Sequence, residues 1–184
     1  MADINEVIGR LTIAVNKENA EERFKIVIKE IEKFYTESLF LEEFEVAIFL
    51  TDKEKSVLSF ACPDYLINSG MIPVTSTEAF TATIFRSGRG IIENNLQQQR
   101  HMSLFEIIRT PDGTIKPIWK MIGALIAVEN EKLGVIEISR RAPGPGDVGE
   151  DFTQSDLHFL ENTIKRLAPF IKKVIPDDFK GKIT

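Results

Sequence analysis

The strongest constraint on the fold comes from two apolar runs, IWKMIGALIAV (118–128) and LGVIEIS (133–139), with only the four residues ENEK between them. The first run is nearly continuous in apolar residues, which is typical of a strand that is buried on both faces. A polar turn this short joins neighbouring antiparallel strands. The two runs therefore predict a β-hairpin at the centre of a sheet.

Further strands are predicted earlier in the chain. Residues 44–50 (FEVAIFL) alternate with the period of two that places one face of a strand in a core, and 56–62 (SVLSFAC) follow the polar turn TDKEK as the return strand. Residues 90–94 (GIIEN) predict a small strand. The segment 63–75 contains a proline and a glycine and is predicted to be a loop.

Apolar residues at helical spacing predict two helices near the N-terminus. The first covers residues 4–15. The second begins at Asn19 and ends near Ser38, and Asn19 with Glu22 forms a variant of the capping box. Each helix carries one apolar stripe, as helices that pack against a core do.

Two more helices are predicted further along the chain. A short one follows a cap at Ser76 or Thr77 and stops at Gly88. The last long helix begins at the capping-box pattern TQSD (153–156), and Pro169 is expected to kink it.

With 184 residues, the chain is long enough for one compact domain. The order of the predicted elements indicates an α+β fold. We expect a central antiparallel β-sheet of about five or six strands. The N- and C-terminal helices are expected to pack together on one face of the sheet, and short helices and loops to cover the other. The domain is expected to span 19–175, after an N-terminal helix in 1–18 and before a tail in 176–184.

Charge and hydropathy exclude several classes of protein. The net charge is −5 at pH 7, and Lys and Arg are interleaved with Glu along the predicted helices, so a broad surface for nucleic acid or an anionic membrane is not expected. The chain has no run of about 18 apolar residues, and its first ten residues lack the basic and apolar parts of a signal peptide. We therefore predict a cytoplasmic protein that binds neither nucleic acid nor membranes.

The few cysteines and histidines limit the possible chemistry. Cys62 is the single cysteine, which excludes an internal disulfide, a redox pair and a cysteine-rich zinc site. The two histidines, His101 and His158, leave few ways to bind a metal or to build an acid–base pair. The sequence pairs no nucleophile with a base, so we predict neither an enzyme nor a metal site.

The stretch GPGDVG (144–149) fits the spacing G-x-G-x-x-G of dinucleotide-binding loops. Such a loop needs a second strand after the helix, and here only about ten tail residues follow the helix. Asp147 and its acidic neighbours would also repel a pyrophosphate. We interpret the stretch as a stiff connection. Arg140 and Arg141 precede it and are expected to form a solvent-exposed charge cluster, with pairing to the loop's acids or to a partner as alternatives.

Three stretches of the chain, 79–94 (AFTATIFRSGRGIIEN), 117–139 and 151–171 (DFTQSDLHFLENTIKRLAPFI), follow one another in a recognisable order. Together they resemble the GAF domain family: the first is similar to its short helix, turn and strand, the second to its central hairpin and the third to its terminal helix. The family consists of small-molecule sensor and dimerisation modules. Their ligands, such as cyclic nucleotides, bilins, haem or small metabolites, lie between the sheet and the short helices. The resemblance therefore implies a sensor.

The sequence departs from the patterns of several such ligands. Ser139-Arg140-Arg141 stands where cyclic-nucleotide-binding members have Asn-Lys, and an insert separates it from Phe152, so a cyclic nucleotide is not expected. Cys62 lies away from the place of bilin attachment. One cysteine also cannot support the disulfide chemistry of relatives that reduce free methionine sulfoxide. No cofactor is assigned.

The resemblance also implies a pocket between the sheet and the short helices. Its candidate ligand-binding residues are Phe60, Phe80, Ile84, Arg86, His101, Leu104, Phe105, Ile108, Trp119 and Met121. Arg86 would hold an anionic ligand and His101 would reach a ligand from the polar segment above. The alternative is that the apolar members simply fill the core and that the polar ones face solvent.

We therefore expect a small-molecule-binding sensory or regulatory domain. Its ligand would alter a cover formed by residues 94–116 and a homodimer interface between the N- and C-terminal helices. Packing of both helices on the sheet is the alternative to a dimer. A separate signalling protein would supply the output.

The competing hypothesis is a dimerisation or protein-interaction scaffold that binds no ligand. A filled pocket would favour the scaffold, and a cavity on the order of several hundred cubic ångströms would favour the sensor.

Overall fold

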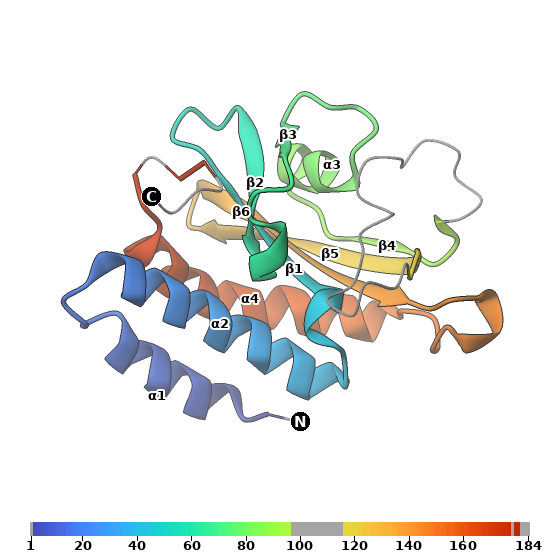
Figure 1. Ribbon diagram of the computed structural model, residues 1–184, viewed down its shortest axis with the longest axis horizontal. Coiled ribbons are helices and arrows are strands. Elements are labelled where there is room, and N and C mark those ends of the chain that lie inside the picture. Colours follow the sequence, from blue (N-terminus) through green and yellow to red (C-terminus); the bar gives the residue numbers. More distant parts are fainter. Residues whose placement is uncertain (1, 97–115, 178, 181–184) are drawn as a thin grey trace.

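In the computed structural model, one antiparallel sheet separates a layer of long helices from a layer of loops and short helices (Figure 1). The structure describes residues 2–96, 116–177 and 179–180. The strands within these ranges are β1 (Val46–Thr51), β2 (Val57–Cys62), β3 (Met71–Pro73), β4 (Ile91–Glu93), β5 (Ile118–Val128) and β6 (Glu131–Arg141). They form a six-stranded sheet in the order β3-β2-β1-β6-β5-β4, which confirms the predicted α+β fold.

The predicted central hairpin is the longest pairing in this sheet, and it runs from Ile118 opposite Arg141 to Val128 opposite Glu131. β6 begins earlier than the sequence indicated, so that two residues form the turn instead of four. Glu129 in this turn has a φ of 55°, the left-handed conformation that tight hairpin turns require.

β6 lies between β1 and β5 in the middle of the sheet, and it approaches β1 very closely at Gly134. A Cβ atom at Gly134 would lie 1.9 Å from the carbonyl oxygen of Phe49. Only glycine therefore allows these two central strands to pair at this point.

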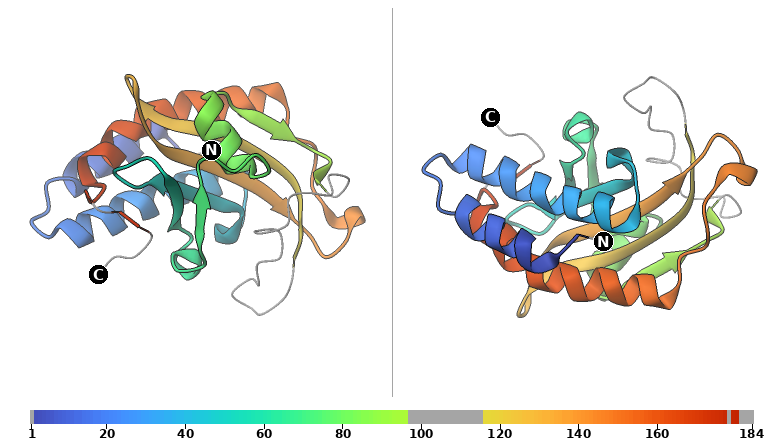
Figure 2. Two further views of the ribbon diagram at one scale, coloured as in Figure 1. Left: turned by 90° about the horizontal axis from the view of Figure 1, so that it is seen from above. Right: turned by 90° about the horizontal axis from the view of Figure 1, so that it is seen from below.

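Three long helices lie on one side of the sheet (Figures 1 and 2). They are α1 (Ile4–Ala14), α2 (Ala20–Leu39) and α4 (Gln154–Val174). Two of them, α2 and α4, lie against the sheet itself, and the third, α1, packs on these two helices. The Asn19 side chain accepts a hydrogen bond from the main-chain N–H of Glu22 at 2.9 Å. The predicted capping box at 153–156 is present, and α4 continues through Pro169. The N- and C-terminal helices thus share one side of the sheet, as predicted.

One apolar core fills the space between these helices and the sheet. Leu11 of α1, Ile31 of α2, Ile136 of β6 and Leu160 of α4 are completely buried in it. Much of the apolar stripes of α1 and α4 is therefore covered within the chain, α4 against the sheet and α1 against α2 and α4. A dimer through these helices stays a prediction.

A buried polar pair joins α2 to α4 inside this core. The Tyr35 hydroxyl lies 2.9 Å from Thr163 Oγ1. Thr163 donates its own hydrogen to the carbonyl of Phe159 at 2.7 Å, so Tyr35 is the donor of the pair. Burial raises the pKa of Tyr35, so the hydroxyl stays protonated and keeps this hydrogen bond.

The opposite face of the sheet carries α3 (Phe80–Ser87) and the short 3₁₀ helix η2 (Asp64–Leu66). α3 packs closely over β5 at Gly123, where a Cβ atom would lie 2.5 Å from Ile84 Cδ1. Lys132 Nζ donates to the carbonyls of Phe85 and Arg86 at 2.6 and 2.7 Å, and so satisfies the C-terminal end of α3. Gly88 ends α3 with a φ of 71°, as predicted.

The turn between β1 and β2 is built around the buried carboxylate of Asp52. This carboxylate accepts hydrogen bonds from the main-chain N–H groups of Ser56 at 2.7 Å and Val57 at 3.1 Å, and from the Ser56 hydroxyl at 2.6 Å. Burial alone would raise the pKa of Asp52, but these bonds lower it below its ordinary value. The carboxylate therefore stabilises the hairpin in its ionised form.

The sequence missed one strand. Residues 63–75 were predicted to be a loop, but they contain η2 and the edge strand β3. β3 has only three residues and ends at Pro73, which is why neither alternation nor propensity indicated it. The predicted cover at 94–116 lies largely outside the described residues.

Candidate ligand-binding site

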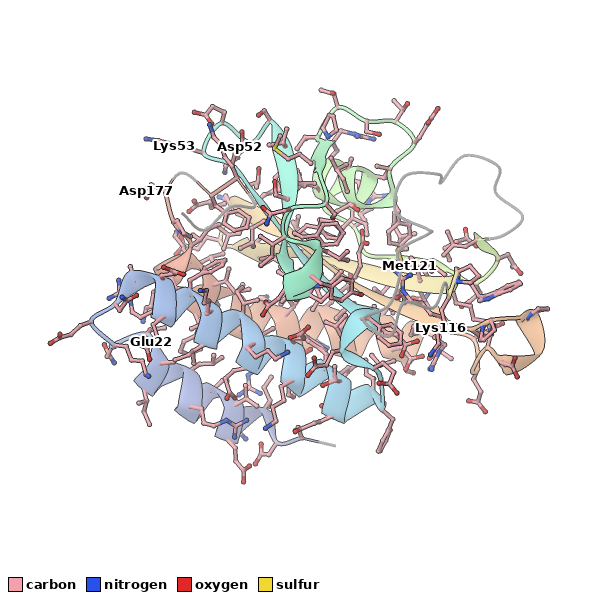
Figure 3. All side chains as sticks on the ribbon, viewed as in Figure 1. Glu22, Asp52, Lys53, Lys116, Met121 and Asp177 are labelled. Atoms are coloured by element: carbon pink, nitrogen blue, oxygen red, sulfur yellow. The ribbon has the colours of Figure 1, made fainter. Side chains whose placement is uncertain are left out.

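A small cavity lies on the face of the sheet that is turned away from the long helices. Its volume is about 40 Å³, enough for about three water molecules. The lining residues are Phe44, Ala47, Phe49, Phe60, Pro63, Leu66, Ile118, Met121, Glu137, Ser139 and Arg141. Figure 3 labels one of them, Met121, on the side of β5 opposite the long helices.

The polar part of this lining comes from one strand. Glu137, Ser139 and Arg141 occupy alternate positions of β6, so their side chains share one face of the sheet. Ile136 and Ile138, which precede and follow Glu137, point to the opposite face and belong to the core under the helices. A single strand thus supplies both the apolar core and the polar wall of the cavity.

Glu137 is a buried carboxyl group with an exposed fraction of 7%. Burial raises its pKa from 4.5 to about 7, although a hydrogen bond with the Thr81 side chain and the nearby charge of Arg141 oppose this rise. Its cross-strand neighbours are Ala47 on β1 and Gly123 on β5, which carry no charge. Near neutral pH, Glu137 is therefore present in both its protonated and its ionised form.

Arg141 lies at the end of the same row of side chains and is partly buried. Its Nη1 donates to the carbonyl of Lys116 at 3.2 Å, and its main-chain N–H donates to Glu45 Oε1 at 2.9 Å. Burial lowers the pKa of the guanidinium, and the hydroxyl of Tyr65 and the carboxylates of Glu45 and Glu137 oppose this effect. The Arg141 guanidinium is thus hydrogen-bonded to a neutral carbonyl oxygen.

Six buried side-chain atoms have no hydrogen-bond partner within residues 2–96, 116–177 and 179–180, and two of them, Glu137 Oε1 and Arg141 Nε, belong to residues that line this cavity. We call these two atoms the unsatisfied pair. Leaving one such atom unpaired costs about 1–3 kcal/mol, and more when the group is charged.

The rest of the wall is apolar. The rings of Phe49 and Phe60 pack with their centroids 4.2 Å apart, and Lys116 Nζ lies 5.2 Å from the centroid of the Phe44 ring. The cavity therefore combines an aromatic wall with a few polar groups, which is the usual composition of a small-molecule site.

The structure brings some of the sequence-predicted residues to this cavity and places others elsewhere. Phe60 and Met121 line it. Phe80 packs beside it, in contact with the Ile118 and Met121 cluster, and Ile84 is buried where α3 meets the sheet. His101, Leu104, Phe105 and Ile108 lie outside the described residues.

Two predicted polar contacts have other partners. Arg86 Nη1 donates to the carbonyls of Val74, at 2.6 Å, and Ser76, and so joins α3 to the chain after β3. Trp119 Nε1 donates to the carbonyl of Ala142 at 2.9 Å. Neither Arg86 nor Trp119 is among the residues that line the cavity.

Glu137 and Ser139 were missed as site residues, and Arg141 was interpreted as a solvent-exposed charge. The signal was present in the sequence LGVIEISRR, because a Glu, a Ser and an Arg at alternate positions of an apolar strand mark one polar face. Arg140 points to the other face, where its guanidinium lies 4.8 Å from the centroid of the Phe152 ring. The expected exposed cluster is therefore wrong for both arginines, which are only partly exposed.

The remaining motifs do not assemble into a site. GPGDVG forms a connection with a short 3₁₀ helix at Pro145–Asp147 before α4. Cys62 is buried, and this burial, together with the nearby Glu32 carboxylate, raises the pKa of its thiol. Its thiol is therefore poorly suited to act as a nucleophile.

A second hollow of about 370 Å³ lies between α2 and Glu43 of the 3₁₀ helix Glu43–Glu45. Its charged lining is largely paired with itself, since Lys29 Nζ lies 2.9 Å from Glu32 and 3.2 Å from Glu43. Among the described residues, no group of three or more His, Cys, Asp or Glu side chains could hold a metal ion. In the same part of the chain, no helix is both long and apolar enough to cross a membrane.

Sequence comparison does not identify the chain, since no protein-family model and no curated protein matches it. Solved structures do match. Residues 122 to 287 of a methyl-accepting chemotaxis protein superpose with a TM-score of 0.67 at 14% identity, over 91% of this chain and 96% of that one. The GAF domain of an Acinetobacter phosphoenolpyruvate-protein phosphotransferase superposes with a TM-score of 0.59 at 11% identity, over 94% of this chain and 95% of that one.

A third structure is the free methionine-R-sulfoxide reductase from Neisseria meningitidis in complex with its substrate. It gives a TM-score of 0.59 at 12% identity, over 95% of this chain and 93% of that one. These matches extend over nearly the whole of each chain, and several of the matched structures are GAF domains. The chain therefore has the fold of a GAF domain.

Proposed function

We propose that the chain is a sensory or regulatory domain that binds a small molecule in the cavity beside β6. The unsatisfied pair is the observation that carries this proposal. Buried polar groups in native proteins almost always have a hydrogen-bond partner, and an exception requires an explanation. A ligand that pairs with Glu137 and Arg141 is such an explanation.

The volume of the cavity sets the size of this ligand. A space of about 40 Å³ accommodates about three to five non-hydrogen atoms. Nucleotides, bilins and haem are much larger, and each would require the walls of the cavity to move. We therefore propose a small metabolite as the ligand.

The same small volume favours a second candidate, a scaffold that binds no ligand. The cavity is far smaller than the volume, on the order of several hundred cubic ångströms, that would favour a sensor. In a scaffold, water molecules alone would pair with Glu137 and Arg141. The two candidates thus differ in what occupies the cavity.

The structural neighbours support a regulatory role with a ligand. One of them is part of a methyl-accepting chemotaxis protein, and another is a domain of a phosphotransferase. The reductase from Neisseria meningitidis was solved with its substrate, so a protein of this fold holds a small molecule. We do not propose the reductase activity for this chain, because Cys62 is its single cysteine and is buried.

Thermal denaturation of the purified protein in the presence of a library of small metabolites tests the proposal. A ligand of the cavity should raise the melting temperature of the wild type but not that of Met121→Trp, in which the larger ring fills the cavity. Met71→Trp is the matched control, because Met71 lies on β3 and is 54% exposed. It should respond as the wild type does.

Native mass spectrometry of the freshly purified protein would show any ligand that it retains. A library that leaves the wild type unchanged, together with a spectrum that shows only the bare chain, would favour the scaffold and refute the sensor. An equal response of wild type and Met121→Trp would place the ligand outside this cavity.

We also propose that the domain is a cytoplasmic homodimer that contacts its copy through the N- and C-terminal helices and signals to a separate output protein. Ile13 on α1 is 72% exposed and would lie in this contact surface. Light scattering after size-exclusion chromatography should show a dimer for the wild type and a monomer for Ile13→Glu. A monomeric wild type would refute the dimer.

A further inference from the structure

The charges around the cavity limit the chemistry of its ligand, provided that the cavity binds a small molecule as proposed above. Arg141 presents a guanidinium whose Nε belongs to the unsatisfied pair and whose Nη1 meets only a neutral carbonyl. It forms none of the ion pairs found among the described residues. A partly buried guanidinium without a carboxylate partner is suited to bind an anion, because its N–H groups match the two oxygens of a carboxylate.

A second cation lies beside the same wall. Lys116 Nζ is positioned over the ring of Phe44, which lines the cavity. Figure 3 shows Lys116 and Met121 at the same end of the molecule. The carboxylate of Glu45 acts on Arg141 and accepts a hydrogen bond from its main-chain N–H, so one negative charge stands against these two cations. The balance of charge at this end of the cavity favours an anionic ligand.

Glu137 completes the polar wall from the other end of the row. It is packed against Thr81 from α3 and between Ala47 and Gly123 of the adjacent strands, and Arg141 is the charged group that acts on it. In its protonated form Glu137 is a hydrogen-bond donor as well as an acceptor. A carboxylate between Arg141 and protonated Glu137 would accept a hydrogen bond from each.

We propose that the cavity binds a small monocarboxylate anion, of the size of formate or acetate, with the Arg141 guanidinium and the Glu137 carboxyl group as its hydrogen-bond donors. The size follows from the volume of about 40 Å³, since formate and acetate have three and four non-hydrogen atoms. The aromatic wall formed by Phe49 and Phe60 would contact the methyl group of acetate.

Calorimetric titration of the purified protein with sodium acetate and sodium formate tests this proposal. Glycine and methylammonium chloride are the zwitterionic and cationic probes, and sodium chloride is the control for ionic strength. We expect binding of acetate or formate, and no binding of methylammonium. Arg141→Gln should weaken carboxylate binding by about tenfold to a hundredfold, because one charge-assisted hydrogen bond is lost.

Arg140→Gln is the matched control for this variant. It removes the same charge from the adjacent residue, whose guanidinium packs on Phe152 on the other face of the sheet. Carboxylate binding should be unchanged in it. If circular dichroism shows that Arg141→Gln does not fold, Arg141→Lys keeps the charge but removes the donor at Nε, and it should also weaken binding.

The pH dependence gives an independent readout of Glu137. Carboxylate binding to the wild type should weaken by up to about a hundredfold between pH 6 and pH 9, as Glu137 loses its proton near pH 7. Glu137→Gln keeps a donor at this position at every pH, so its affinity should not change over this range.

Tighter binding of glycine or methylammonium than of acetate would overturn the proposal, as would unchanged carboxylate binding in Arg141→Gln. A melting temperature that rises with another class of metabolite, in a manner sensitive to Met121→Trp, would overturn the carboxylate ligand and leave the sensory function standing. The absence of any small-molecule response in the library experiment would refute both.

Discussion

Replacing Glu137 by glutamine should make the protein more stable in alkaline solution and should remove one component of its pH dependence. The side chain is buried beside β1 and β5, and glutamine has nearly the same shape. Glutamine can keep the hydrogen bond with Thr81 but cannot ionise. The variant therefore isolates the free energy of ionising this carboxyl group in the folded protein.

The pKa of Glu137 sets the size of the effect. Because its folded-state pKa of about 7 lies above its ordinary value of 4.5, the folded protein binds the proton more tightly than the unfolded chain does. The stabilisation is complete below pH 4.5 and is lost as the pH rises through 7. Since one pKa unit corresponds to about 1.4 kcal/mol, the free energy of unfolding should fall by about 3 kcal/mol over this range.

Urea denaturation followed by circular dichroism at pH values from 5 to 9 measures the effect. At pH 5 the variant and the wild type should differ little, and at pH 8.5 the variant should be more stable by about 3 kcal/mol. Glu54→Gln removes a carboxylate from the exposed β1–β2 turn and controls for the change in net charge. A difference between Glu137→Gln and wild type that stays constant over this pH range would refute the buried, raised pKa of Glu137.

Three further substitutions test the fold. Asp52→Asn should lower the free energy of unfolding by about 1–3 kcal/mol at pH 7. The loss should shrink in acid, where the wild-type carboxylate takes up a proton, and urea denaturation of wild type and variant at pH 7 and pH 3 measures it. Tyr35→Phe should cost about 1 kcal/mol by thermal melting, because Thr163 keeps its own bond to a carbonyl and loses only the donor from Tyr35; a cost above about 3 kcal/mol would contradict this assignment. Gly134→Ala should prevent folding, since its Cβ would overlap the carbonyl of Phe49, and a native circular dichroism spectrum of this variant would contradict the close pairing of β1 and β6.

The helices and the two hairpins could be predicted from the sequence because their signals are local. Apolar spacing located α2, and the capping pattern at 153–156 marked the start of α4. β3 could not be found in this way. It is an edge strand of three residues that is held in place by pairing with β2. Three residues are too few to show the alternation of apolar and polar side chains by which a strand is recognised.

The candidate site was harder to predict because it depends on contacts between distant segments. Met121 and Phe60 come from apolar strands, and nothing local distinguishes a residue that lines a cavity from one that fills the core. Arg141 was read as a surface charge because arginine usually is one. Its surroundings come from residues that are far from it in sequence: Glu45 and Lys116 accept its hydrogen bonds, and Tyr65 acts on its charge.

The alternation of side chains along β6 also protects the protein against misfolding. A slip of this strand by one residue relative to β1 would turn Glu137 and Ser139 toward the long helices and would move Ile136 and Ile138 to the other face. A carboxyl group would then lie without water among the apolar side chains that pack against α2 and α4. The residues proposed to bind a ligand thus also exclude the wrong register, so a substitution chosen to alter ligand specificity at Glu137 would also relax the specificity of strand pairing.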